Sequence, residues 1–377
     1  MTTAATATLA PSRRELRPRW LPFGLACLVP LLGLAVALAP RGPLLLAMPA
    51  LLFGLVPLLD LLCGRSREPL EPESAARLLR LARYDLWLWL WVPLHWAVVL
   101  VAISQTGARL SQGTHTHLEL GLQAVSVGMV GALGINVAHE LMHRRGGAER
   151  ALAEVLMMAT SYTHFCVEHV LGHHRNVATP MDPASSRLGE SAWAFLPRTI
   201  LGGLRSAWHL EGERVRRTGE ARTLRDRRLR YPLALLTLWV GIGVAWGPLA
   251  LAFFLAQGAV GVVLLELVNY VEHYGLSRRE LRAGVYERTT PFHSWNASER
   301  VTNWLLFHLE RHADHHAYAS RPYFALRHVD DSPQLPTGYA GMLLLALVPP
   351  LWRRVMDPRV HAWQERQRQL EAVADQG

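Results

Sequence analysis

Lysine is absent from this 377-residue chain, so every one of its 39 basic residues is an arginine. Cysteine is scarce: only Cys27, Cys63 and Cys166 occur, and no two of them form a Cys-x-x-Cys pair. A disulfide framework and a zinc ribbon are therefore excluded. Internal repeats are also lacking, and low-complexity sequence is confined to the Ala/Thr-rich first ten residues. We therefore expect a single domain over residues 1–377.

The composition is unusually apolar. Half of the residues are hydrophobic, the mean hydropathy is +0.12 and there are 13 Trp, which exceeds what a soluble domain of this size normally carries. An integral membrane protein is therefore the first class to consider. The net charge of +9 favours contact with anionic membrane lipid over nucleic acid, because the chain is so apolar. We expect no nucleic-acid partner.

Long apolar runs predict an all-α integral membrane protein. Each run approaches the ~20 residues needed to cross a bilayer, although the fifth is short. The first follows an Arg-rich segment, but it is long and lacks a clear cleavage site, so we interpret it as a retained helix and not as a signal peptide. Six transmembrane helices, paired as three hairpins, are predicted at residues 21–39, 44–63, 86–104, 118–138, 232–246 and 248–268.

The arginines predict the orientation, because short Arg-rich loops stay in the cytoplasm. Nine Arg lie between Arg205 and Arg230, whereas the opposite loops hold little more than Arg41 and Arg109. Both termini and the His-rich regions 139–230 and 269–340 are then cytoplasmic. The last apolar stretch, Met342 to Trp352, is interrupted by prolines and too short to span, so we expect it on the surface or as a cap. Further arginines after the second run are Arg65, Arg67, Arg77, Arg80 and Arg83.

Nine of the 18 histidines form groups near the predicted helix ends. On a helix, residues four apart share a face, which predicts that His139 lies beside His143, His169 beside His173, and His312 beside His316. Imidazole suits Fe, Zn, Cu and Ni, and nine ligands are too many for one ion but enough for two. The alternative is a set of surface histidines bound to water and lipid headgroups. The candidate ligands are His139, His143, His169, His173, His174, His273, His312, His315 and His316.

Four carboxylates each stand directly next to a clustered histidine in the sequence, so they do not share its helix face. They are candidates for orienting a ligand ring from another segment, as carboxylates commonly do around metals. A solvated or Arg-paired carboxylate is the alternative for each. These residues are Glu140, Glu168, Glu272 and Asp314.

Three other chemistries are compatible with parts of this pattern. Residues 139–143 read His-Glu-x-x-His, the motif of zinc proteases, but that interpretation leaves seven clustered histidines unexplained. A membrane fatty-acyl desaturase also uses histidine boxes and oxygen. A metal transporter is disfavoured, because transport sites tend to lie near the bilayer midplane and not at span ends.

At these residues the sequence resembles the membrane-bound alkane hydroxylases, and more distantly the hydroxylase subunit of xylene monooxygenase. The resemblance covers most of residues 130–360, and the box NYVEHYGL points to hydroxylases more than to desaturases. The similar stretches are 136–144 (NVAHELMHR), 168–187 (EHVLGHHRNVATPMDPASSR), 269–276 (NYVEHYGL), 293–296 (HSWN), 309–317 (LERHADHHA), 335–342 (LPTGYAGM) and 349–358 (PPLWRRVMDP).

The resemblance implies that the nine histidines ligate two Fe ions and that n-alkanes are hydroxylated at the terminal carbon with O2. It also implies electrons from a separate rubredoxin, fed by a rubredoxin reductase, and a place in the bacterial inner membrane. Asp182 joins the carboxylates expected around the ligands, and Leu52 is a candidate for the substrate tunnel, although lipid-facing packing is the alternative. Alkyl side chains of aromatic compounds are alternative substrates. The family often has Gln where this chain has Glu310, which adds a carboxylate near the metals.

Overall fold

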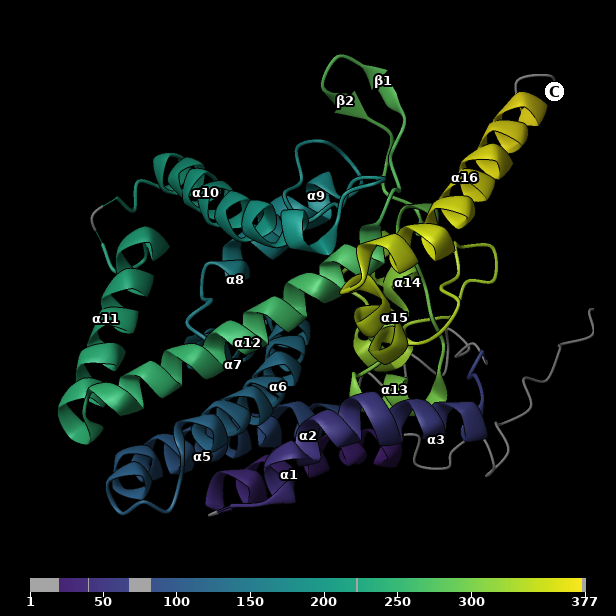
Figure 1. Ribbon diagram of the computed structural model, residues 1–377. Helices are drawn as coiled ribbons and strands as arrows, with labels where there is room; N and C mark the ends of the chain where they lie inside the picture. Colours follow the sequence, from purple (N-terminus) through teal and green to yellow (C-terminus); the bar gives the residue numbers. More distant parts are fainter. Residues whose placement is uncertain (1–19, 40, 68–82, 222, 375–377) are drawn as a thin grey trace, which may run out of the picture.

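The computed structural model describes residues 20–39, 41–67, 83–221 and 223–374 and consists mainly of helices (Figure 1). Within these ranges, six helical segments are long and apolar enough to cross a membrane, which confirms the predicted number. Arg13, Arg14, Arg17, Arg19, Arg77 and Arg80 lie outside the described residues. The six segments are Leu21–Leu38, Pro43–Cys63, Tyr84–Ser111, His117–Met142, Arg227–Trp246 and Pro248–His273.

The first two spans are composite helices. In the first, the 3₁₀ segment η1 (Leu21–Cys27) continues as α1 (Leu28–Leu38). The second contains a π-helical turn, η3, which interrupts the α-helical hydrogen bonding in mid-span. Its pieces are η2 (Pro43–Leu46), α2 (Ala47–Ala50), η3 (Leu51–Leu55) and α3 (Val56–Cys63).

The other four spans are regular helices that exceed their predicted bounds. The fifth is long enough to span because it begins at Arg227, where the Asp226 side chain accepts a hydrogen bond from the Arg228 amide and caps it. The fourth and sixth continue past their apolar runs into buried polar sequence. These helices are α5 (Arg83–Ser111), α6 (His117–Met142), α11 (Arg227–Trp246) and α12 (Pro248–His273).

Helix α6 lies at the centre of the bundle, and most of its length is buried. Consecutive spans are in contact as predicted for hairpins, and α6 packs in addition along α12 (Figure 1). Gly128 and Gly261 allow this close approach. A Cβ at Gly128 would lie 2.5 Å from the carbonyl oxygen of Gln257 on α12. The last turns of α6 and α12 therefore end next to each other.

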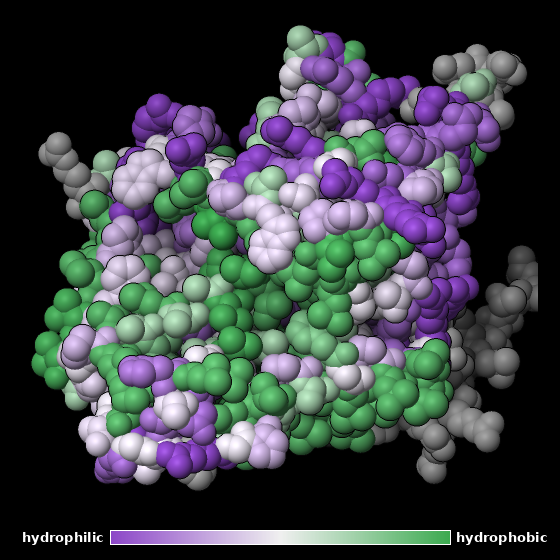
Figure 2. Space-filling view, in the orientation of Figure 1, coloured by the Kyte–Doolittle hydropathy of each residue, from purple (hydrophilic) through white to green (hydrophobic). Residues whose placement is uncertain are grey.

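The remaining elements cover that end of the bundle. Figure 2 shows an apolar band between hydrophilic surfaces, the larger of which surrounds the β hairpin, α10 and α16 at the top and right. These elements are α7 (Gly147–Ala159), α8 (Phe165–Glu168), η4 (His169–His173), α9 (His174–Asn176), α10 (Ala192–Thr218), β1 (Glu280–Arg282), β2 (Val285–Tyr286), η5 (Pro291–His293), α13 (Arg300–Leu305), α14 (His312–Ala317), η6 (Tyr323–Ala325), α15 (Tyr339–Ala346) and α16 (Pro349–Ala374).

The last apolar stretch does not span and caps the bundle. Its first part lies in α15, which packs against α12. Its second part forms the start of α16 at Pro349. Trp352 and Met356 of this helix belong to a buried cluster beside Tyr270 of α12. The prolines therefore mark the start of a new helix.

Candidate metal centre

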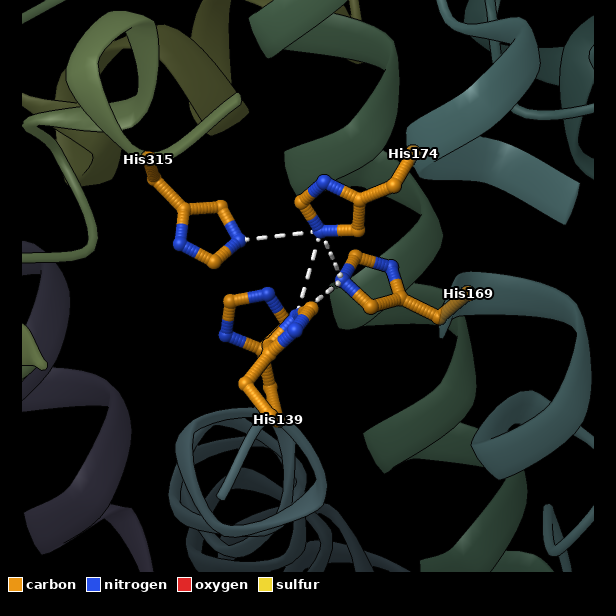
Figure 3. Close-up of side chains that lie close together, drawn as sticks. His139, His169, His174 and His315 are labelled. Atoms are coloured by element: carbon orange, nitrogen blue, oxygen red, sulfur yellow. Dashed lines mark hydrogen bonds between the residues drawn. The ribbon is translucent and has the colours of Figure 1, made fainter. Parts of the chain in front are cut away.

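All nine candidate histidines converge where α6 and α12 end, and they divide into two sets. In each set one ligand atom per residue lies within 4.8 Å of all the others. The rings of the first set come from three separate parts of the chain and point toward one another (Figure 3). The five-histidine set is His139, His143, His169, His174 and His315, and the four-histidine set is His173, His273, His312 and His316.

One predicted pair is divided between the two sets. The rings of His169 and His173 do lie beside each other, with centroids 5.1 Å apart. His169 nevertheless shares its set with His174, because η4 (His169–His173) is a π-helical turn in which the His174 amide bonds to the His169 carbonyl. A π-helix places residues five apart on one face. The turn therefore directs His169 and His174 to one set and His173 to the other. The predicted pairings of His139 with His143 and of His312 with His316 agree with the structure.

In the five-histidine set, the short distances between Nε2 atoms indicate that a metal ion can bind between the rings. Nε2 of His174 lies 3.0 Å from that of His169 and 3.1 Å from those of His143 and His315 (Figure 3). One imidazole nitrogen carries at most one proton, so these contacts cannot all be hydrogen bonds. Nitrogens bonded to one ion at about 2 Å lie roughly 3 Å apart when the bonds meet at right angles. The first set thus fits a bound metal ion.

The four-histidine set shows the same spacing. Nε2 of His316 lies 3.2 Å from that of His173 and 2.9 Å from that of His312. Nε2 of His273, like that of His139 in the first set, is buried and has no hydrogen-bond partner among the described residues. Buried polar atoms normally have partners. A second ion would satisfy these nitrogens, so the residues present fit two metals.

The protonation of the rings also suits metal binding. Burial lowers the pKa of His143 to about 4. Burial, followed by repulsion from neighbouring imidazoles, holds the pKa values of His169, His174, His312, His315 and His316 well below their usual range. Neutral imidazole is the ligating form. These rings are therefore ready to bind a cation near neutral pH.

His173 is held by a carboxylate. Its Nδ1 donates to Oδ2 of Asp182 at 2.9 Å, and Ser185 Oγ donates to the same oxygen at 2.6 Å. Burial alone would lower the pKa of His173, but the Asp182 charge and hydrogen bond raise it to about 9. Fixing the proton on Nδ1 leaves Nε2 directed at the four-histidine set. Asp182 therefore lies where a ring-orienting carboxylate is needed.

The other proposed carboxylates take different partners. Glu140 pairs with Arg144 at 3.0 Å and accepts from the Tyr323 amide, and Asp314 pairs with Arg321 and Arg327. Within the part of the chain that the structure describes, neither forms a hydrogen bond to a ligand ring, and both pair with arginines instead. The zinc-protease interpretation of residues 139–143 is not supported. Glu140, which would be the general base, is paired with arginine, and His139 shares its set with four other histidines.

Glu272 lies against a ligand, whereas Glu168 forms no hydrogen bond to a ligand ring among the described residues. Oε2 of Glu272 lies 3.1 Å from Nε2 of His312, the atom directed at the metal site, while Oε1 accepts from the Tyr339 hydroxyl at 2.7 Å. Glu272 thus faces the centre itself. Burial, and then Asp182, raise the pKa of Glu168 to about 8. Tyr339 was not anticipated, because nothing in its local sequence distinguishes it from other tyrosines.

Glu310 is hydrogen-bonded away from the two histidine sets. Its oxygens accept from the Asn303 side chain and the Tyr339 amide, both at 2.8 Å. Burial, together with the nearby Glu299, raises the pKa of Glu310 well above its usual range. The shift favours the protonated form of this carboxyl group.

A narrow apolar cavity of about 110 Å³ leads to the histidines. Leu52 and Phe53 of the π-helical turn η3 line it, together with aliphatic residues of α12 and α15. His139, His169 and His312 form its inner wall, so both metal sets border the cavity. Asn136, Asn269 and Thr302 contribute polar atoms there, and the sequence pattern does not predict them because none belongs to a histidine group.

Six spans with two all-histidine sets at one end define a multi-pass membrane protein of the histidine-box, metal-binding class. Residues 116–346 match the fatty acid desaturase family model. The chain is 45% identical to alkane 1-monooxygenase 2 of Pseudomonas aeruginosa, with 83% of each chain covered. It is 40% identical to alkane 1-monooxygenase of Ectopseudomonas oleovorans, over 82% of this chain and 77% of that one.

The chain therefore belongs to the alkane 1-monooxygenase family of non-haem iron enzymes. A more distant relative is the xylene/toluene monooxygenase hydroxylase component of Pseudomonas putida, 28% identical over 61% of each chain.

Proposed function

We propose that this enzyme hydroxylates the terminal carbon of n-alkanes to primary alcohols with O2, using two Fe ions held by the nine histidines. The observation that carries the proposal is the apolar cavity whose inner wall is formed by histidines of both sets. An unactivated C–H bond offers no acidic proton or electrophile to a side chain, so bound iron would supply the redox chemistry with O2.

The protein's own residues then position the substrate and exclude water. The cavity holds an alkane by apolar contacts alone, through Leu52, Phe53, Leu264 and Leu265 along its length. Asn136 is held by its bond to the Leu306 carbonyl at 2.8 Å. Asp182 fixes the tautomer of His173, and Tyr339 fixes Glu272. Because histidines line the cavity at one side and aliphatic side chains line the rest, one end of the alkane would lie against the histidines, which favours a terminal carbon.

The product distinguishes this proposal from two alternatives. The purified enzyme, given a mid-chain n-alkane, a reducing system and ¹⁸O2, is expected to form the labelled primary alcohol. An alkene would instead indicate desaturation, which the match to the fatty acid desaturase family brings into consideration. Faster oxidation of xylene than of the alkane would favour alkyl side chains of aromatics, as the similarity to the xylene/toluene monooxygenase component suggests. Either result contradicts terminal alkane hydroxylation.

Leu52 is proposed to limit chain length. It is half-buried in η3 and lines the cavity, so Leu52→Trp should fill part of the space beyond the reacting carbon. We expect the longest accepted alkane to become several carbons shorter, with shorter alkanes oxidised at nearly the original rate. Leu55→Trp is the control, because Leu55 lies in the same turn but is 47% exposed and outside the cavity lining. An unchanged chain-length profile in Leu52→Trp would contradict this role.

Electrons are proposed to come from rubredoxin, itself reduced by rubredoxin reductase, at the surface nearest the histidines. Arg175 follows His174 and is exposed. Tyr318, half exposed, carries Arg321 at 4.2 Å and Arg327 at 5.6 Å from its ring centre. Rubredoxins are generally acidic, and a basic surface would steer one to this site. With this side cytoplasmic, as the Arg distribution predicts, the enzyme would lie in the bacterial inner membrane.

Reversing one charge tests the docking surface. Arg175→Glu should raise the KM for rubredoxin by roughly tenfold at low salt and by less at high salt, since salt screens the interaction. Turnover with saturating rubredoxin should change little. The matched control is Arg216→Glu at the far end of α10, where the side chain is 75% exposed. Equal KM values in the two variants would place rubredoxin elsewhere.

A further inference from the structure

A second cavity of about 280 Å³ adjoins the apolar one. We call it the side chamber; it lies between the end of α3, the start of α13 and the loop before α15. Thr302 and Ala340 line both cavities, so they form the partition between them. The side chamber contacts no histidine of either set, and the function proposed above does not use it.

The two cavities differ in chemistry. Asp60, Arg65 and Glu299 give the side chamber charged walls, whereas Pro57 and Leu61 give it an apolar one. The Asp60 carboxylate is already hydrogen-bonded to the start of α13, because it accepts from the amides of Val301 and Thr302 at 2.7 and 3.1 Å. Glu299 and Arg65 also line the chamber; Oε1 of Glu299 accepts from Arg65 and Oε2 accepts from the Ser298 amide at 3.0 Å, and each carboxylate oxygen can accept a further hydrogen bond. The chamber therefore suits a molecule with one polar group and a short apolar part.

The side chamber opens to the surface past a single arginine. Arg65 Nε donates to Glu299 at 3.1 Å, and Arg65 Nη2 donates to the Pro336 carbonyl at 3.2 Å, so this side chain bridges the mouth. Its side chain is 40% exposed, and the adjoining Leu61 is 80% exposed. The partner of this arginine is buried, since the Glu299 side chain is only 10% exposed. Opening the mouth therefore requires Arg65 alone to swing away, exchanging its two contacts for water.

We propose that the side chamber binds the hydroxylated product, a primary alcohol, and is its way out of the enzyme. An alkane has no hydrogen-bonding group and gains nothing by entering a charged chamber. A new hydroxyl, in contrast, finds few free partners in the apolar cavity, because the donors of Asn136, Asn269 and Thr302 are already bonded to the protein, so its transfer to polar partners is favourable. Among the described residues, Thr302 and Ala340 are the two that line both cavities, so the route would pass between them. Substrate and product thereby use different openings. This inference rests on the function proposed above.

Photolabelling tests where the alcohol binds. The probes are a primary alcohol with a diazirine next to its hydroxyl end and the matching diazirine alkane, each irradiated with the full-length enzyme in lipid nanodiscs. The alcohol is expected to label Leu61 or Thr337 of the chamber, and the alkane to label only residues of the apolar cavity. Labelling of the same residues by both probes, with the chamber unlabelled, would overturn the proposal.

Two variants test the route in opposite directions. Ala340→Leu narrows the partition and should slow alcohol release. Because Ala340 also lines the apolar cavity, the readout is the ratio of steady-state turnover to the rate of the first turnover, which should fall by about fivefold. Arg65→Ala opens the mouth and should weaken inhibition by added alcohol by about threefold. The controls are Leu344→Phe, on an exposed face of α15, and Arg67→Ala, an exposed arginine outside the chamber.

The smaller change Ala340→Val repeats the test if the leucine variant fails to fold, as judged by iron content and elution from a sizing column. Equal release rates in wild type and in the folded partition variant would refute the exit route. Failure of the proposed function looks different: the wild-type enzyme would then form no alcohol from an alkane. Wild-type alcohol formation with an unlabelled chamber would contradict the side chamber alone.

Discussion

Replacing one histidine of either set with glutamine should abolish alkane hydroxylation and lower the iron content from about two to about one per chain. His143→Gln tests the five-histidine set and His312→Gln the four-histidine set. Both rings are part of a close Nε2 network, so a lost ring leaves its neighbours facing one another without a cation. The losses should be selective, each variant releasing the ion of its own set. Iron analysis and Mössbauer spectroscopy of the purified variants measure this.

His209→Gln is the matched control for those variants. His209 lies on α10 with a side chain that is 72% exposed and paired with Glu213, so its loss should leave iron content and activity unchanged. Full retention of both irons in His143→Gln or His312→Gln would contradict the assignment of that set. Loss of both irons from each variant would instead mean that the two sets bind as one unit.

Asp182→Asn should weaken iron binding at the four-histidine set by about 10- to 100-fold, the usual cost of losing a carboxylate behind a ligand histidine. The change keeps the shape of the side chain but removes the charge that Nδ1 of His173 faces at 2.9 Å. Iron retained after dialysis against a graded series of chelator concentrations measures the affinity. The five-histidine set should keep its ion, because Asp182 contacts none of its rings among the described residues.

The control for Asp182→Asn is Asp330→Asn. Asp330 also pairs with a histidine, lying 3.1 Å from Nε2 of His328, but its side chain is 77% exposed and His328 is in neither set. This variant should behave as wild type. Equal iron affinity in Asp182→Asn and the wild type would show that His173 does not depend on its carboxylate. Restoration of binding by Asp182→Glu would support a charge-dependent role.

The helices and the ligand groups were predictable because both depend on local periodicity. A run of about 20 apolar residues has one stable form in a bilayer, and histidines four apart in an α-helix meet on one face. His139 with His143 and His312 with His316 follow this rule. The division into sets of five and four was not predictable, since it depends on which chain segments meet at the ends of α6 and α12.

The π-helical turn η4 could not be predicted from local sequence periodicity. Its α-helical alternative would pair His169 with His173, whereas the observed turn pairs His169 with His174. No residue in the segment requires a π-turn by itself. The turn packs tightly against α10, because a Cβ at Gly172 would lie 2.7 Å from Glu168 and 2.9 Å from Leu210 of α10. The same holds for Asp182, whose contact with His173 closes a loop that sequence spacing does not define.

The most direct test of the central claim is the metal content of the purified wild-type enzyme, combined with iron X-ray absorption spectroscopy. The two histidine sets predict about two irons per chain, each with a coordination shell dominated by imidazole nitrogen. One zinc per chain and no iron, with no oxygen-dependent product from an alkane, would contradict that claim.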